Sequence, residues 1–291
     1  MSHSQLSVGH LPHFAFWQAG RFELNLASPL IMGILNLTPD SFSDGGQHDS
    51  LDQALAHAQR LLDEGADILD VGAESTRPGA TPLTADQEWA RLAPVLTELV
   101  RWQRPVSVDT YHPATMVKAL DLGVDIINDI WGFRQPGALA SVASSSCGLC
   151  VMHMQGDPQT MQLQPIANDA MGVVQRFFQE RQDALLAAGV ANRRWLLDPG
   201  IGFGKNVAQN LALLRHQADL LTLGQPLLVG WSRKSTLGQV TGLDAPHRQI
   251  PSVAAALMAV ERGARVVRVH DVALTRQALQ VWMATQDFQG Q

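Results

Sequence analysis

The sequence lacks the features that mark several common classes of protein. Two cysteines in 291 residues cannot build a disulfide framework, so a disulfide-stapled secreted domain is excluded. The sequence contains no run of about 18 consecutive apolar residues, so we expect no transmembrane helix. Residues 1–30 carry His, Gln, Arg and Glu without an apolar core, which argues against a secretory signal. We therefore expect a reduced, cytoplasmic protein.

Positive charge is also scarce. There are 21 Lys and Arg residues against 27 Asp and Glu residues, and the formal net charge is −6. A general polyanion binder shows a basic face or tail, and the sequence has neither, so we expect no nucleic-acid partner. If the substrate is an anion, the positive charge that binds it must gather in one pocket.

The 46% hydrophobic content argues against disorder and for a large buried core.

What the sequence does contain is a regular alternation of short apolar segments and amphipathic helical patterns. Continuous apolar segments are typical of parallel strands that are covered on both faces. The eight segments are residues 30–35, 68–71, 106–108, 126–130, 149–152, 195–197, 227–229 and 266–269.

The boundaries of the helical patterns carry recognisable signals. Ser50 with Gln53, and Thr84 with Gln87, have the spacing of capping boxes at helix starts. Before three of the apolar segments a glycine stands where a helix would end in the left-handed conformation. These glycines are Gly65, Gly123 and Gly263.

Eight strand–helix units without a linker predict an α/β fold, a single-domain (β/α)8 (TIM) barrel. The alternative is a doubly wound open sheet, but no Gly-x-Gly-x-x-Gly follows the first strand. Residues 14–27 precede the barrel and are expected to form a hairpin that plugs its bottom. We therefore divide the chain into an N-terminal extension, 1–29, and a barrel, 30–286.

The expected C-terminal ends of all eight strands carry polar side chains. Barrel enzymes build their active sites at this end, so the pattern predicts one convergent site. In chain order the groups are Asn36, residues 74–79, Asp109-Thr110, Asn128-Asp129, residues 153–156, residues 198–200, residues 232–235 and residues 268–271.

Two kinds of chemistry are present among these residues. Asp109, Asn128 and Asp198 can accept hydrogen bonds from the paired N–H edge of a planar heterocycle, although a structural amide remains the alternative for Asn128. The last two strand ends carry basic residues suited to phosphate, which barrels commonly bind there. These residues are Arg233, Lys234, Arg268 and His270.

Five segments resemble the signatures of the dihydropteroate synthase family. Residues 36–46, Asn-Leu-Thr-Pro-Asp-Ser-Phe-Ser-Asp-Gly-Gly, resemble the first signature. Residues 72–79, Gly-Ala-Glu-Ser-Thr-Arg-Pro-Gly, resemble the second. Residues 198–205, 232–235 and 268–271 follow in the family's order, and the similarity extends from about residue 30 to 285.

The resemblance implies a transferase of folate biosynthesis. The family joins p-aminobenzoate to 6-hydroxymethyl-7,8-dihydropterin diphosphate and releases diphosphate, by a dissociative path in which a pterin methylene cation precedes attack by the amine. The residues that match the family's pterin diphosphate ligands are Thr76, Asp109, Asn128, Asp198, Lys234, Arg268 and His270. Among them, Asp109, Lys234 and Arg268 are expected to be catalytic.

The resemblance also implies a p-aminobenzoate subsite, which is the site of sulfonamide action in the family, and a Mg²⁺ ligand, Asn36. The subsite residues are Phe42, Arg77, Pro78 and Ser232. It further implies a homodimer formed through outer helices. Apolar residues of the last helices give weak support to that expectation: Leu257, Met258, Leu279 and Trp282.

Some positions depart from the commoner family pattern. They are Ala73, Tyr111-His112, Trp231 and residues 250–253, and they affect the shape of the p-aminobenzoate subsite rather than the matched polar ligands. The spacing of Cys147 and Cys150 could suggest metal or redox chemistry, but no second pair exists, and we interpret both as buried structural residues.

Two other functions are considered. A methyltetrahydrofolate-type pterin methyltransferase would share the pterin-binding Asp and Asn but would not need the cations of residues 232–235 and 268–270. A non-catalytic pterin-binding paralogue would lack some of the matched ligands, and none is missing.

Overall fold

The computed structural model describes residues 15–37, 47–74, 81–157, 160–161 and 165–287. Parallel strands close into a barrel in which each strand pairs with the next along the chain and the last pairs with the first, as predicted. Around the barrel the strands are β3 (Leu30–Asn36), β4 (Ile68–Gly72), β5 (Val106–Asp109), β6 (Ile126–Asp129), β7 (Gly148–Met152), β8 (Trp195–Asp198), β9 (Leu227–Val229) and β10 (Ala264–Val269). Their bounds differ from the expected ones by at most two residues.

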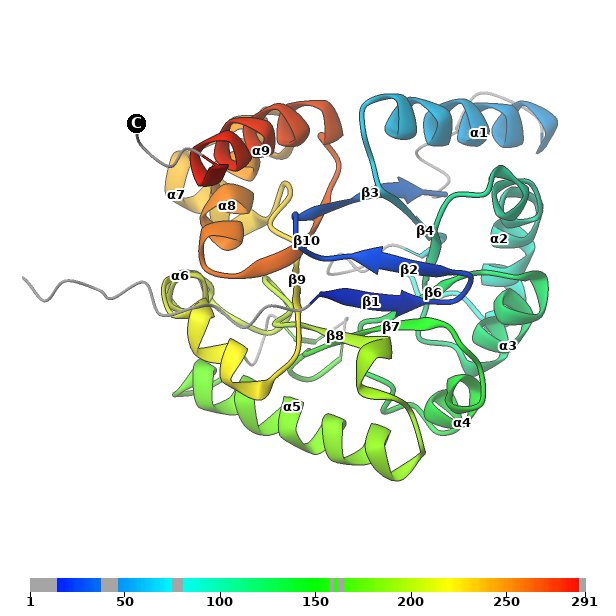
Figure 1. Ribbon diagram of the computed structural model, residues 1–291, viewed down its shortest axis with the longest axis horizontal. Coiled ribbons are helices and arrows are strands. Elements are labelled where there is room, and N and C mark those ends of the chain that lie inside the picture. Colours follow the sequence, from blue (N-terminus) through cyan, green and yellow to red (C-terminus); the bar gives the residue numbers. More distant parts are fainter. Residues whose placement is uncertain (1–14, 38–46, 75–80, 158–159, 162–164, 288–291) are drawn as a thin grey trace, which may run out of the picture.

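Helices follow the strands and surround the barrel (Figure 1). The α-helices are α1 (Gln47–Asp63), α2 (Ala85–Leu99), α3 (Pro113–Leu122), α4 (Ala138–Ala143), α5 (Ala170–Ala187), α6 (Val207–Arg215), α7 (Ser235–Thr241), α8 (Gln249–Glu261) and α9 (Val272–Asp287). Short 3-10 helices are η2 (Val100–Trp102), η3 (Asn192–Arg194), η4 (Gln217–Leu223) and η5 (Ala245–His247). Among the described residues, no helix is both long enough and apolar enough to cross a membrane.

The helix boundaries show which local signals were correct. Thr84 caps α2: its hydroxyl accepts from the Gln87 N–H, and the Gln87 side chain accepts from the Thr84 N–H. The capping box expected at Ser50 is wrong, because α1 already includes Gln47 and Ser50 therefore lies inside the helix. The glycines expected to end helices are in the left-handed region, with φ of +101° at Gly65, +100° at Gly123 and +93° at Gly263.

The N-terminal hairpin closes the bottom of the barrel, as expected. Strands β1 (Phe16–Ala19) and β2 (Phe22–Asn25) pair antiparallel, and in Figure 1 they lie across the centre of the ring of helices. Trp17 is fully buried, and its indole N–H donates to the carbonyl of Arg194 at 2.9 Å. It packs with Ala19 and Leu26 on one apolar layer from the barrel strands, made of Met32, Ile68, Ile126, Cys150, Leu196, Leu228 and Val266.

The alternation of strand side chains explains why a polar layer lies above this apolar floor. Successive residues of a strand point to opposite faces, so the residue two positions after a floor residue also points into the barrel. Four of these residues are polar or charged: Asp70, Asn128, Asp198 and Arg268. The same geometry places the apolar residues between them against the outer helices.

Candidate active site

Three of the predicted ligands lie side by side across neighbouring strands. Asn36 is paired in register with Gly72, Gly72 with Asp109, and Asp109 with Asn128. Gly72 contributes no side chain to this row. A Cβ at Gly72 would lie 3.8 Å from Asp109 Oδ2 and 3.9 Å from Asn36 Oδ1. The two oxygens therefore border the same space at the carboxyl ends of the strands.

Arg268 lies at the centre of the charged network. Its Nε donates to Asp70 Oδ2 at 2.6 Å, and its Nη2 donates to Asp109 Oδ2 at 2.7 Å. Burial lowers the pKa of Arg268, but the charges of Asp70 and Asp109 outweigh burial and raise this pKa above its ordinary value. The guanidinium therefore stays charged at the mouth of the barrel, where an anionic substrate group needs a partner.

Asp70 is a site residue that the sequence analysis missed. It is completely buried, and besides Arg268 it accepts from Asn128 Nδ2 at 3.3 Å. Asp70 lies inside residues 68–71, one of the apolar segments. The signal that could have found it is a single carboxylate within a buried strand. A charge in the barrel interior needs a partner, so such a residue is expected to belong to a polar site.

The two other carboxylates of the interior have strongly shifted pKa values. Burial raises the pKa of Asp109 to about 7, although Arg268 opposes the shift. Burial also raises the pKa of Asp198 to about 6, although a hydrogen bond from the Gly200 N–H, at 2.7 Å from Oδ1, opposes it. Asp198 is 5% exposed and the Asp109 side chain is 19% exposed, so both carboxylates are largely shielded from water, and in such surroundings a hydrogen bond to a ligand is strong.

Lys234 belongs to the same site. Burial and the positive charge of Arg268 lower its pKa to about 8, while Asp198 and Asp109 oppose the shift. Its ammonium lies 4.3 Å from the centre of the Phe203 ring, which is a cation–π contact. Lys234 therefore lies within the electrostatic reach of Asp198, Asp109 and Arg268.

Ser232 and His270 are in direct contact, although the sequence analysis expected them to bind different substrates. The His270 N–H donates to Ser232 Oγ at 3.1 Å, and His270 Nδ1 lies 3.0 Å from the same oxygen. The expected p-aminobenzoate subsite and the expected diphosphate ligands therefore adjoin at the ends of β9 and β10.

Two of the polar strand ends serve local structure instead of the convergent site. The Asp129 carboxylate accepts from the N–H groups of Trp131, at 2.8 Å, and Phe133, at 2.7 Å, and so holds the turn after β6. His153 is buried against Phe177 of α5, outside the barrel. Burial, with the charges of Lys205 and Arg134, lowers the pKa of His153 to about 2. Residue type alone did not show which face these side chains take.

Four predicted ligands lie outside the described residues: Phe42, Thr76, Arg77 and Pro78. The described residues on either side of 75–80 are joined, because the Glu74 carboxylate accepts from the Leu83 N–H at 2.8 Å. The same carboxylate accepts from the Tyr111 hydroxyl at 2.9 Å, and His112 Nε2 lies 3.9 Å away. The departures from the family pattern at Tyr111 and His112 thus contact Glu74.

The donor set at the site fits Mg²⁺ that is partly bound by the substrate. Among the described residues, no three His, Cys, Asp or Glu side chains are grouped closely enough to hold a metal ion. Mg²⁺ prefers oxygen ligands and is usually held by one or two protein groups together with substrate phosphates. The amide oxygen of Asn36, beside Asp109, is such a donor.

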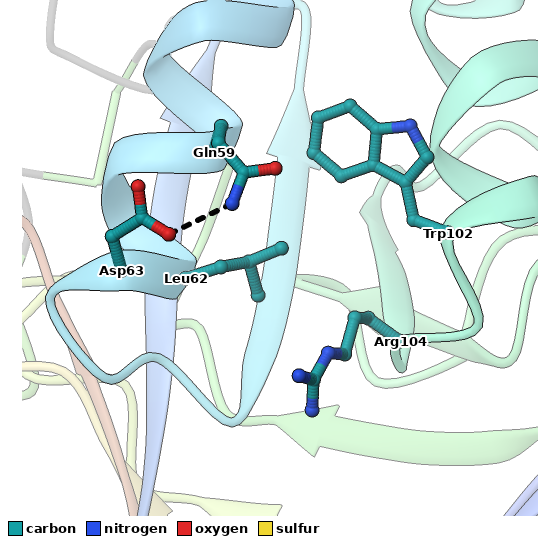
Figure 2. A pocket seen from close by; sticks show the side chains of 5 residues that line it. All are labelled: Gln59, Leu62, Asp63, Trp102 and Arg104. Atoms are coloured by element: carbon teal, nitrogen blue, oxygen red, sulfur yellow. Dashed lines mark hydrogen bonds between the residues drawn. The ribbon is translucent and has the colours of Figure 1, made fainter.

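A shallow hollow elsewhere in the molecule is separate from this site. Figure 2 shows it between the last turns of α1 and the segment after α2. It lies near the starts of β4 and β5, whereas the polar layer is at their carboxyl ends. Its lining residues are Gln59, Leu62, Asp63, Trp102 and Arg104.

Comparisons with known proteins agree with the fold and identify the family. Residues 32–270 match the family model described as "Pterin binding enzyme". A dihydropteroate synthase of Neisseria meningitidis serogroup B is 53% identical over 275 residues, covering 92% of this chain and 96% of the relative. That of Escherichia coli K12 is 45% identical over 263 residues, covering 90% and 93%.

Solved structures show the same similarity. The dihydropteroate synthase of Burkholderia cenocepacia, complexed with 7,8-dihydropteroate, has a TM-score of 0.86 and 51% identity, covering 94% of this chain and 96% of that one. The Yersinia pestis enzyme, in a sulfonamide drug complex, has a TM-score of 0.87 and 46% identity, covering 93% and 99%. The chain therefore belongs to the pterin-binding enzymes and, within them, to the dihydropteroate synthase family.

Proposed function

We propose that this protein condenses 6-hydroxymethyl-7,8-dihydropterin diphosphate with p-aminobenzoate, forming 7,8-dihydropteroate and diphosphate for folate biosynthesis. The observation that carries the proposal is the polar layer inside the barrel, where acceptors for a heterocycle adjoin cations for an anion. Its members are Asp109, Asn128, Asp198, Lys234 and Arg268. Relatives have been solved with 7,8-dihydropteroate and with 4-aminobenzoic acid.

The carboxylates and the amide bind the pterin ring. Asp198 accepts from the paired N–H edge of the ring, since an ionised carboxylate has only acceptors to offer. Asn128 adds an amide that can both donate and accept hydrogen bonds. Lys234 donates a hydrogen bond to a nitrogen or an oxygen of the ring. Thr76, outside the described residues, completes the set expected from the sequence.

The cations bind the diphosphate. Arg268 and His270 contact its oxygens, and Asn36 would hold a Mg²⁺ ion, which on binding neutralises part of the charge that develops on the leaving group. Arg268 has to shift its contact with Asp109 or use its remaining N–H groups, because Nε and Nη2 are already engaged.

The reaction follows a dissociative path. The C–O bond between the pterin methylene and the diphosphate breaks first, and the electron pair leaves with the diphosphate. Asp109 stabilises the resulting cation electrostatically. The amine of p-aminobenzoate, placed by Ser232 with Phe42, Arg77 and Pro78, then attacks the methylene carbon and loses a proton.

An assay of diphosphate release tests the function directly. The protein is incubated with the pterin diphosphate and Mg²⁺, with and without p-aminobenzoate, and 7,8-dihydropteroate is identified by mass spectrometry. We expect product only when both substrates are present. Methyl transfer from methyltetrahydrofolate would instead favour the methyltransferase, and pterin binding without turnover would favour the non-catalytic paralogue.

We further propose that the protein works in the cytoplasm as a homodimer. Both thiols, Cys147 and Cys150, are free and buried, which suits a reduced compartment.

Apolar side chains that suit a dimer interface are exposed on α8, at Ile250 and Met258, and on α9, at Leu274 and Val281. Three residues predicted from the sequence do not offer such a surface, because Leu279 is fully buried in the core and Leu257 and Trp282 pack against it. Sedimentation equilibrium tests the dimer.

A further inference from the structure

Arg233 adopts a backbone conformation that is rare for its residue type. Its φ is +57°, in the left-handed region that L residues other than Gly, Asn and Asp seldom occupy. The residue stands between Ser232 and Lys234, two residues of the candidate site. Such a conformation persists only when surrounding contacts hold it in place.

The backbone of Arg233 is held on both sides. Its N–H donates to Ser252 Oγ at 2.9 Å, and its carbonyl accepts from Arg248 Nη1 at 3.0 Å. Arg248 reaches this carbonyl by passing closely over α7 at Gly238, where a Cβ would lie 2.2 Å from Arg248 Nη2. A glycine inside that helix therefore makes room for the contact.

The side chain of Arg233 points to a carboxylate. Its Nη2 lies 2.6 Å from Asp271 Oδ1, and its Nε lies 3.2 Å from Asp271 Oδ2. This is the bidentate arrangement in which Arg and a carboxylate pair best. One position earlier on both segments, the His270 N–H donates to Ser232 Oγ. Two successive links thus join the segment after β9 to the end of β10.

We propose that Arg233 is a positioning residue: paired with Asp271, it holds Ser232 and Lys234 in the geometry that the substrates require, and it does not itself bind the diphosphate. Its place among the basic residues of the last two strand ends suggests a phosphate ligand. Its carboxylate partner is Asp271, however, and not a member of the polar layer that holds Arg268. This inference rests on the proposed synthase function.

Two single substitutions distinguish a positioning role from a ligand role. Arg233→Ala and Asp271→Ala remove opposite charges from the same pair. If Arg233 acts through Asp271, both variants lower kcat/KM in the same direction, each by about tenfold or more, because both misplace Ser232 and Lys234. If Arg233 binds diphosphate, Arg233→Ala raises the KM of the pterin diphosphate, whereas Asp271→Ala frees the guanidinium and leaves that KM unchanged or lower. The second pattern overturns the proposal.

A charge swap and a control sharpen the test. In Arg233→Asp/Asp271→Arg the pair can re-form with its polarity reversed, and Asp tolerates the left-handed region better than Arg. We expect the swap to recover most of the kcat/KM that Arg233→Asp alone loses. Arg233→Lys should retain more of the wild-type kcat/KM than Arg233→Ala does. The matched control is Arg101→Ala, which breaks the exposed Arg101–Glu98 pair before the start of β5, at the opposite end of the strands, and should leave both KM values unchanged.

Melting temperatures separate this role from a merely structural one. If the pair only stabilises the fold, kcat falls together with the melting temperature while both KM values stay constant, and the proposal is wrong.

The wild-type assay is run first. If the wild type turns over and the pair variants match it, only this inference fails. If the wild type shows no turnover, the proposed function fails, and the same variants are compared by calorimetric binding of 7,8-dihydropteroate, where equal affinities overturn the inference.

Discussion

Arg268 and Asp70 form an ion pair inside the barrel, with Arg268 Nε 2.6 Å from Asp70 Oδ2. Asp70 is inaccessible to solvent, and the Arg268 side chain is 21% exposed. The pair anchors the Nε side of the guanidinium in the polar layer, while Nη2 contacts Asp109 at the end of β5. The orientation of Arg268 therefore depends on a buried residue of a strand far from it in the sequence.

We predict that Asp70→Ala is strongly destabilising. Removal of the Asp70 carboxylate leaves Arg268 with Asp109 as its remaining carboxylate partner and leaves Asn128 Nδ2 without its acceptor. Loss of a buried hydrogen bond to a charged group typically lowers the free energy of unfolding by about 1.5–3 kcal/mol. Urea denaturation measures the effect. Glu98→Ala, which breaks the exposed Glu98–Arg101 pair, is the control and should cost less than about 1 kcal/mol. Equal costs for the two variants would show that the Asp70 pair contributes nothing.

We predict that Arg268→Ala weakens binding of the pterin diphosphate by about ten- to a hundredfold. Loss of a charge-assisted contact costs about 1.5–3 kcal/mol, which corresponds to that range of affinity. The affinity of Arg268→Lys should lie between those of the wild type and Arg268→Ala, since Lys keeps the charge but not the bidentate fork. Calorimetric titration with the diphosphate ester measures both variants, and an unchanged affinity would remove Arg268 from the diphosphate ligands.

We predict that Asp198→Asn abolishes most pterin binding while the circular dichroism spectrum stays native. Asp198 Oδ1 accepts from the Gly200 N–H. In the variant the amide oxygen keeps this bond, so the NH₂ group faces the N–H edge of the pterin and donor meets donor. Wild-type affinity in a binding titration would mean that Asp198 only caps the turn at Gly200.

We predict that pterin affinity falls as the pH decreases below about 6. The pKa of Asp198 is raised to about 6, so the carboxylate that accepts the N–H pair is ionised above this pH and protonated below it. Affinity should then fall by up to tenfold per pH unit on the acid side. Titrations between pH 5 and pH 8 test this, and the residual binding of Asp198→Asn should lack the trend. A flat profile in the wild type contradicts the prediction.

We predict that Trp17→Ala destabilises the barrel from its bottom. Trp17 is fully buried against the floor layer, and truncation of a buried Trp costs about 3–5 kcal/mol of unfolding free energy. Trp17→Phe retains most of the apolar contact but loses the hydrogen bond to the Arg194 carbonyl, so it should cost less. Denaturation of the two variants side by side measures the difference. A cost for Trp17→Ala no greater than that for Trp17→Phe would show that the hairpin does not support the floor.

The sequence by itself determined the order of the strands, the closure of the barrel and the strand ends at which the candidate site lies. Eight apolar segments separated by helical patterns allow few other arrangements, and the residues at the ends of the strands must then meet at one mouth. Local chemistry also fixed the Thr84 cap and the left-handed turns at Gly65, Gly123 and Gly263, because these depend only on neighbouring residues.

Tertiary structure alone decided the direction and partner of each polar side chain. A one-residue difference sends a strand side chain to the opposite face, which is why Asn128 joins the site while Asp129 holds a turn. Closure of the barrel brings Arg268 to Asp70, 198 positions away, and turns Arg233 toward Asp271. These pairs form because a charge taken out of water needs a partner, and only the folded chain supplies one.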